Sequence, residues 1–205
     1  MGERRPLQSR DARWAKATAS FLATRRVPPN AISLGSVVAA AIAGAALILS
    51  RDFSRIPLLV TAALAIQLRL ICNLLDGMVA VEGKLGSKSG EIYNDLPDRI
   101  ADPLILVAAG YATPFLWGPP LGWCAGLLAV MTAYVRLLGA ATGAGQDFRG
   151  PMAKPQRMAV MTVAALAEIF VSGYALAAAL ALIILGCVVT IARRTANIKR
   201  ILESK

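Results

Sequence analysis

Long apolar stretches, separated by short polar or basic segments, dominate this chain of 205 residues. An apolar stretch of about 20 residues is long enough to cross the hydrocarbon core of a bilayer as a helix. We expect six such helices, at Ala31–Leu49, Ile56–Ala80, Ile100–Leu116, Leu121–Ala141, Met158–Val171 and Tyr174–Ala192. The pattern therefore predicts an all-α integral membrane protein with six transmembrane helices.

The segment before the first apolar stretch is basic, and from Asp11 to Leu22 it is also amphipathic, with Trp14 and Phe21 set against Arg13. A helix of this kind lies in the membrane interface, on anionic lipid. The alternative is an ordinary basic leader that is partly disordered. Basic residues continue to Arg26 and the apolar stretch that follows has full spanning length, so this is not the pattern of a cleaved signal.

The distribution of basic residues predicts how the chain is oriented. Lys and Arg gather before the first stretch, before the fifth stretch and after the sixth, while only Arg51 and Arg55 fall on the other side. Because cytoplasmic loops carry the excess of positive charge, both termini are expected in the cytoplasm. We therefore expect a multi-pass protein of the cytoplasmic (inner) membrane, with a basic segment at 1–26, a six-helix domain at 27–195 and a basic cytoplasmic tail at 196–205.

Composition narrows the chemistry. The net charge is +10, but the basic residues flank apolar stretches and do not alternate with polar and aromatic residues, so no nucleic acid is expected as a partner. The chain has no His, which removes the usual general base and the commonest transition-metal ligand. Its three cysteines lie inside apolar stretches without paired spacing, so a disulfide framework or a zinc site is not expected.

One polar segment, residues 73–102, interrupts the succession of apolar stretches. Two stripes with i, i+3, i+7 spacing would each occupy one face of a helix: Asn73, Asp76 and Ala80, and then Asp95, Asp98 and Asp102. Oxygen ligands without His or Cys select hard cations such as Mg²⁺, Mn²⁺ or Ca²⁺. The alternative is that these acids lie in a solvated loop and pair with basic neighbours.

Pro97 bears on where the third helix begins. Proline fits best in the first turn of a helix, where its missing N–H has no partner to lose. We therefore expect this helix to begin near Asn94 or Asp95, with its N-terminal dipole facing the polar segment.

The same segment resembles the signature of the CDP-alcohol phosphatidyltransferase family, D-x-x-D-G-x-x-A-R-x(8,9)-G-x-x-x-D-x-x-x-D. The match needs no gap and retains the signature residues Asp76, Gly77, Ala80, Gly90 and Asp98. The chain departs from the signature at Asn73 and Asn94, which replace Asp, and at Val81, which replaces Arg. An alternative register, with Asp98 and Asp102 as the last pair, needs a longer insertion and loses the glycine.

This resemblance implies a phospholipid-synthesising enzyme. It would transfer the phosphatidyl group of a CDP-linked lipid such as CDP-diacylglycerol to a small alcohol, for example glycerol 3-phosphate or inositol (phosphate), and release CMP. It also implies one or two Mg²⁺ or Mn²⁺ ions, contact with membrane lipids, and a homodimer. The alternative is a catalytically impaired relative that binds a lipid or a partner, which the three departures favour.

The roles of individual residues follow from the resemblance. Asn73, Asp76, Asn94 and Asp98 would hold metal, and Asp98 would also be the catalytic base. Gly77, Ala80 and Gly90 would leave room for the CDP moiety. Each Asn keeps a carbonyl oxygen but removes one negative charge, so Asp95 and Asp102 are candidate compensating acids.

Basic residues are candidates for binding the acceptor alcohol. Lys154 and Arg157 precede the fifth stretch, and Arg136 lies within the fourth. By location they match the basic residues with which the family binds acceptor phosphate. The alternative is that Lys154 and Arg157 only set the topology. Arg136 and Arg69 lie within apolar stretches, where an arginine either serves function or forms a structural ion pair.

Overall fold

The computed structural model describes residues 11–83 and 90–204, and this part of the chain is helical, without strands. It contains the helices α1 (Arg13–Thr24), α2 (Pro29–Leu49), α3 (Arg55–Glu82), α4 (Gly90–Ala112), α5 (Gly118–Ala141), α6 (Lys154–Ala167) and α7 (Tyr174–Glu203). The expected all-α fold is confirmed, and each predicted apolar stretch has become one helix.

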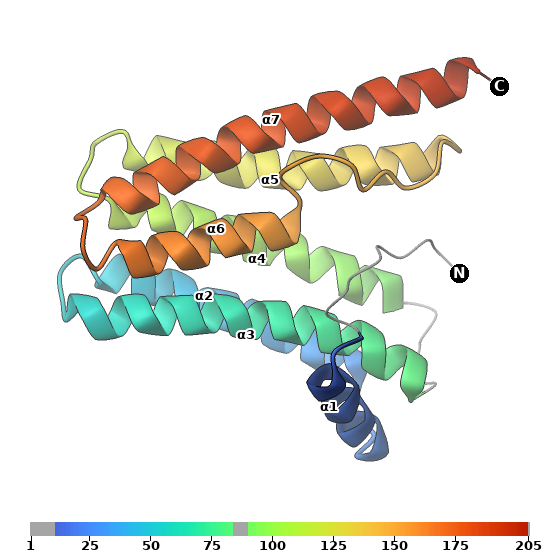
Figure 1. Ribbon diagram of the computed structural model, residues 1–205, viewed down its shortest axis with the longest axis horizontal. Helices are drawn as coiled ribbons and strands as arrows, with labels where there is room; N and C mark the ends of the chain where they lie inside the picture. The colour runs from blue at the N-terminus through green and yellow to red at the C-terminus, as the bar shows by residue number, and fades with distance from the viewer. Residues whose placement is uncertain (1–10, 84–89, 205) are drawn as a thin grey trace.

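Helices α2 to α7 run roughly along one axis, and α1 lies across them beside the end of α3 (Figure 1). Helix α2 packs against α3 and α4, α4 against α5, α5 against α7, and α3 against α6. The α2–α3, α4–α5 and α6–α7 connections lie at one end of the bundle, whereas the α5–α6 connection and the end of α7 lie at the other, near α1 (Figure 1). We call this second end the α1 end.

In the described part of the chain, four helices are long and apolar enough to cross a membrane: α2, α3, α5 and α7. Helix α4 has enough residues but carries several charges, and α6 has only 14 residues. At 1.5 Å per residue α6 is about 21 Å long, shorter than the hydrocarbon core of about 30 Å. The composition of the helices thus supports four of the six expected spans.

Helix α4 begins earlier than expected. It starts at Gly90, so Pro97 and Pro103 both lie inside it and not in its first turn. The expectation of a start near Asn94 or Asp95 is therefore wrong. A proline removes one backbone hydrogen bond, and inside a bundle the packing of neighbouring helices holds the turn together. Here α2 and α5 supply that packing.

Small residues bring α4 and α5 close together. A Cβ atom added to Gly122 would lie 2.8 Å from the carbonyl oxygen of Leu106 and 3.0 Å from the Cα atom of Val107. Membrane helices use small residues at such contacts because they let the backbones approach. This approach fixes α4, which carries the acids of the polar segment, against the rest of the bundle.

Helix α1 confirms that the segment expected to be amphipathic is helical. Its buried alanines, Ala15 and Ala19, pack in one cluster with Leu75 and Val79 of α3. Trp14 remains half exposed. That α1 also lies on lipid stays a prediction.

Candidate functional site

One face of α3 carries three polar side chains at i, i+4 and i+7: Arg69, Asn73 and Asp76. Arg69 has no exposed surface, and Asp76 is 2% exposed. Such side chains are costly inside a membrane protein and are normally paired or functional. They begin the charged cluster, which we define as Arg69, Asp76, Asp98, Asp102, Lys154 and Arg157.

Helix α4 contributes two buried acids, one turn apart, which share the Arg69 side chain. Arg69 Nη2 donates to Asp98 Oδ1 at 3.2 Å and to Asp102 Oδ1 at 2.5 Å. Both acids are at most 4% exposed. A single guanidinium therefore joins α3 to two successive turns of α4.

Helix α6 supplies the remaining cations from its first turn. Lys154 Nζ donates to Asp98 Oδ2 at 2.5 Å, and Arg157 Nη2 donates to Asp102 Oδ2 at 2.5 Å. The charged cluster thus contains three carboxylates and three cationic side chains, so their formal charges cancel. Both oxygens of Asp98 and both oxygens of Asp102 are occupied by basic partners.

Asp76 has no basic residue in direct contact among the described residues. Its Oδ2 atom accepts a hydrogen bond of 2.6 Å from Ser33 of α2, and its Oδ1 atom accepts from the Gly77 amide at 2.5 Å. Lys154 and Asp98 lie close enough to act on it electrostatically. Asp76 and Asp98 are therefore two buried acids that interact through space and not by direct contact.

Small residues adjoin Asp76. Gly77 is buried, yet a Cβ atom added to it would meet no described atom within 4 Å. Ala80 and Gly90 are only partly buried. Small side chains therefore lie where the family resemblance places the nucleotide, whereas Val81, at the family's Arg position, is 55% exposed.

The two amide positions differ in what the structure shows. Asn73 is partly buried, and its Nδ2 atom is buried without a hydrogen-bond partner. Asn94 lies in α4, but its side chain is outside the described residues. Within the described ranges, no three Asp, Glu or Cys side chains come together as a metal site. The described oxygen donors, on Asp76, Asp98 and Asn73, fit one hard cation better than two.

Asp95 and Arg136 form a second ion pair beside the cluster. Asp95 Oδ1 accepts from Arg136 Nη2 at 2.6 Å and from Arg99 Nη2 at 2.9 Å. Arg136 also stacks on the ring of Phe148, 5.6 Å from the centroid. The two candidate compensating acids, Asp95 and Asp102, therefore each hold two arginines.

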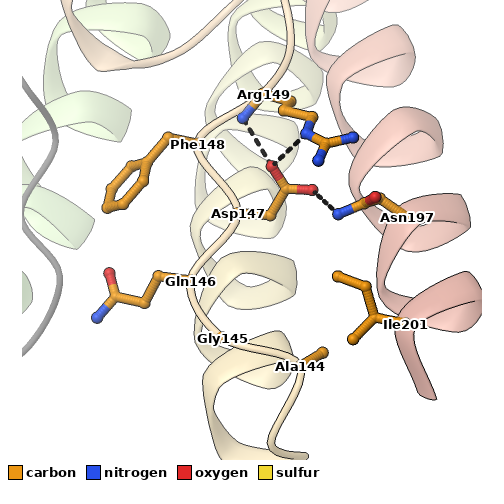
Figure 2. A pocket seen from close by; sticks show the side chains of 8 residues that line it. All are labelled: Ala144, Gly145, Gln146, Asp147, Phe148, Arg149, Asn197 and Ile201. Carbon is orange, nitrogen blue, oxygen red and sulfur yellow. Dashed lines mark hydrogen bonds and ion pairs between the residues drawn. The ribbon is translucent and has the colours of Figure 1, made fainter. Parts of the chain in front are cut away.

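A cavity of about 370 Å³ lies between the α5–α6 connection and the end of α7 (Figure 2). Asp147 lines it, accepting from Asn197 Nδ2 at 2.8 Å and from the Arg149 amide at 2.9 Å. The side chains of Gln146 and Phe148 point to the opposite side of the connection (Figure 2). These contacts tie the connection to α7 at the α1 end.

The candidate acceptor-binding residues differ in how much of each side chain is free. Arg157 is 2% exposed and donates to Asp102, to Thr132 Oγ1 at 3.2 Å and to the Met152 carbonyl at 2.9 Å. Lys154 remains 28% exposed. Lys154 and Arg136 are thus better placed than Arg157 to meet a ligand.

The opposite end of the bundle holds a buried acid, Glu168. It also explains why Arg55, a basic residue, lies on the side where few basic residues are expected. Glu168 accepts from Arg55 Nη2 at 2.8 Å, from the Leu176 amide at 3.1 Å and from the Gly173 amide. Arg55 therefore brings no net charge to that end. The sequence does not predict the Ser33–Asp76 contact or the Arg55–Glu168 pair. In each, the two residues are far apart in the sequence, so no local spacing indicates that they meet.

Comparison with known proteins finds proteins of similar fold but no match in sequence to a family model or a curated protein. No family model matches the chain, and no curated protein matches it either. Among solved structures, the phosphatidylinositol phosphate synthase PgsA1 of Mycobacterium tuberculosis with CDP-DAG bound has a TM-score of 0.76 at 19% identity, covering 91% of this chain and 94% of that chain.

Two further structures of that synthase are similar. The complex with manganese and citrate has a TM-score of 0.75 at 18% identity and covers 90% of this chain and 88% of that chain. The apo form has a TM-score of 0.69 at 21% identity and covers 89% of this chain and 94% of that chain. The chain therefore shares its fold with this synthase over nearly its full length.

Proposed function

We propose that this protein transfers the phosphatidyl group of a CDP-linked lipid, such as CDP-diacylglycerol, to a small alcohol and releases CMP. The observation that carries the proposal is that the buried signature acids Asp76 and Asp98 interact electrostatically, and that a Cβ atom added to Gly77, next to Asp76, would meet no described atom within 4 Å. Support comes from the shared fold with a synthase whose structure contains CDP-DAG.

The proposed reaction forms one phosphorus–oxygen bond and breaks another. The acceptor hydroxyl oxygen attacks the phosphorus next to the diacylglycerol, the bond to the CMP oxygen breaks, and the hydroxyl proton passes to a base. Asp98 is the proposed base, and it requires Lys154 to leave Oδ2 free. Lys154 and Arg136 would then bind a phosphate on the acceptor, such as that of glycerol 3-phosphate or inositol phosphate.

A divalent cation, Mg²⁺ or Mn²⁺, is part of this proposal. Asp76 and Asp98, with the amide oxygens of Asn73 and Asn94, would hold it. When bound, such an ion neutralises diphosphate charge. A structure of the similar synthase contains manganese, which supports this assignment.

The proposal extends to the whole molecule. All six helices α2 to α7 would cross the inner membrane, with α4 and α6 shielded by apolar neighbours and α1 on the lipid surface. The α1 end, both termini and the site would face the cytoplasm, and two chains would form a dimer.

The experiment measures CMP release by the purified full-length protein in detergent, with CDP-diacylglycerol, Mg²⁺ or Mn²⁺, and a panel of alcohols. A general base contributes about 10²- to 10⁴-fold, so Asp98→Ala should lose at least about 100-fold. Glu203→Gln is the control, because Glu203 is 66% exposed at the end of α7. Release that persists in Asp98→Ala contradicts the assignment of the base.

A second function is favoured by one observation, the occupation of both Asp98 oxygens by Arg69 and Lys154. In that case the protein would bind a lipid or a partner without turning it over. No CMP release with any acceptor, together with retained binding of CDP-diacylglycerol, would support this alternative.

A further inference from the structure

Three buried donor atoms on one face of α3 have no acceptor among the described residues. They are Arg69 Nε, Arg69 Nη1 and Asn73 Nδ2, and among the described residues they are the only buried side-chain nitrogen or oxygen atoms without a hydrogen-bond partner. Buried polar groups are nearly always hydrogen-bonded, because an unpaired one loses its hydration without compensation. Three such atoms on successive turns of one helix face point to a missing ligand.

The chemistry of these atoms defines the ligand. An arginine side chain has five N–H donors and no acceptor, and only its Nη2 atom is used here, between Asp98 and Asp102. A donor group cannot coordinate a metal ion, whereas a planar guanidinium matches the oxygens of a phosphate. The free donors therefore suit an anionic oxygen.

The charge balance agrees with this reading. At two signature positions the chain has amides, Asn73 and Asn94, and thus two negative charges fewer than the family pattern. Arg69 places one fixed positive charge between Asp98 and Asp102, where a further cation would otherwise be attracted. With fewer acids and an internal cation, the site has less capacity for a second ion.

We infer that Arg69, assisted by Asn73, donates directly to an oxygen of the CDP diphosphate and takes the place of a second divalent ion. This inference rests on the proposed function, because it assumes a CDP-linked ligand. It differs from a structural ion pair, in which Arg69 would only hold α3 against α4. CDP affinity distinguishes the two roles. If Arg69 were purely structural, replacing it in a protein that still folds would leave CDP affinity unchanged.

The test uses CDP and Mn²⁺ with the full-length protein in detergent. The Mn²⁺ bound per chain is counted by electron paramagnetic resonance at saturating CDP, and CDP affinity is measured by calorimetry. We expect one Mn²⁺ per wild-type chain. We expect Arg69→Gln to weaken CDP binding at least tenfold while the Mn²⁺ count stays at one.

Arg55→Gln is the matched control, since Arg55 is also an α3 arginine paired with a buried acid but lies at the other end of the bundle. It should leave CDP affinity unchanged. Thermal unfolding of each variant reports whether it is folded. Should Arg69→Gln not fold, Arg69→Lys decides, because lysine keeps the charge beside Asp98 but lacks the Nε and Nη1 donors; it should also bind CDP more weakly.

A count of two Mn²⁺ ions per wild-type chain overturns the inference, as does a loss of CDP affinity below tenfold in folded Arg69→Gln. In Arg69→Lys, unchanged affinity overturns it. Wild-type protein that binds no CDP overturns both this inference and the proposed function. Retained, Arg69-dependent CDP binding without any CMP release contradicts the proposed transfer reaction alone and leaves the Arg69 contact supported.

Discussion

Lys154 and a divalent cation would compete for the same oxygen atom of Asp98. Lys154 lies 2.5 Å from Oδ2 and is 28% exposed, so its ion pair is partly screened by solvent. A pair of this kind contributes about 0.2–1 kcal/mol, which corresponds to a factor of up to about five in binding. We expect Lys154→Met to tighten Mn²⁺ binding about threefold by this arithmetic. Calorimetry measures it, and Lys199→Met, at an exposed site on α7, should show no change.

Gly77 allows a separate test of the space beside Asp76. A Cβ atom there meets no described atom, and alanine favours a helix by about 1 kcal/mol over glycine. Gly77→Ala should therefore unfold at the same temperature as the wild type or higher. Gly77→Leu should also fold but lose CDP affinity tenfold or more, because its side chain would fill the nucleotide space. Equal CDP affinity in Gly77→Leu would place the nucleotide elsewhere.

How far the sequence predicts the site differs between residues. The signature spacing predicts that Asp76 and Asp98 share one site, and in the structure both acids are buried and interact electrostatically. The partners of these acids are not predictable in the same way, because Ser33 and Lys154 lie far from them in the sequence and meet them only after the helices pack. Arg69 was visible as an intramembrane arginine, but its contact with two acids depends on the distance between α3 and α4.

At the scale of helices, the two helices that carry most of the charged cluster are those that hydropathy identifies least clearly as membrane spans. Helices α4 and α6 hold Asp98, Asp102, Lys154 and Arg157. Helix α4 is long enough to cross a membrane but carries several charges, and α6 is too short. The apolar pattern still predicted both as helices. The early start of α4 does not follow from the local preference of Pro97, because it depends on the packing that α2 and α5 provide.

The contact between α4 and α5 should tolerate no added side chain. In Gly122→Ala the new Cβ atom would lie within 3.0 Å of backbone atoms of Leu106 and Val107, so the helices must separate. Overpacking of this kind costs about 1–3 kcal/mol. Gly35→Ala on α2 is the matched control, because its Cβ atom meets nothing within 4 Å. We expect a lower free energy of unfolding in detergent for Gly122→Ala only, and equal stabilities would argue against this close approach.

At the scale of the whole molecule, the two ends of the bundle should face opposite compartments. Ser172 lies in the α6–α7 connection, and Ser204 follows α7 at the α1 end. In a variant without its native cysteines, we expect Ser204→Cys to react with a membrane-impermeant maleimide only in inside-out vesicles, and Ser172→Cys only in right-side-out vesicles. Labelling of both from one side would contradict the proposed six spans.

The charge balance of the cluster has a consequence for how the protein is made. Arg69, Lys154 and Arg157 pair with the buried acids Asp98 and Asp102 without help from outside the chain. A newly inserted chain can therefore bring α3, α4 and α6 together even in a cell that is short of divalent ions. We expect the thermal unfolding temperature of the purified protein to be the same with and without EDTA, because these ion pairs, and not a metal ion, hold the three helices together.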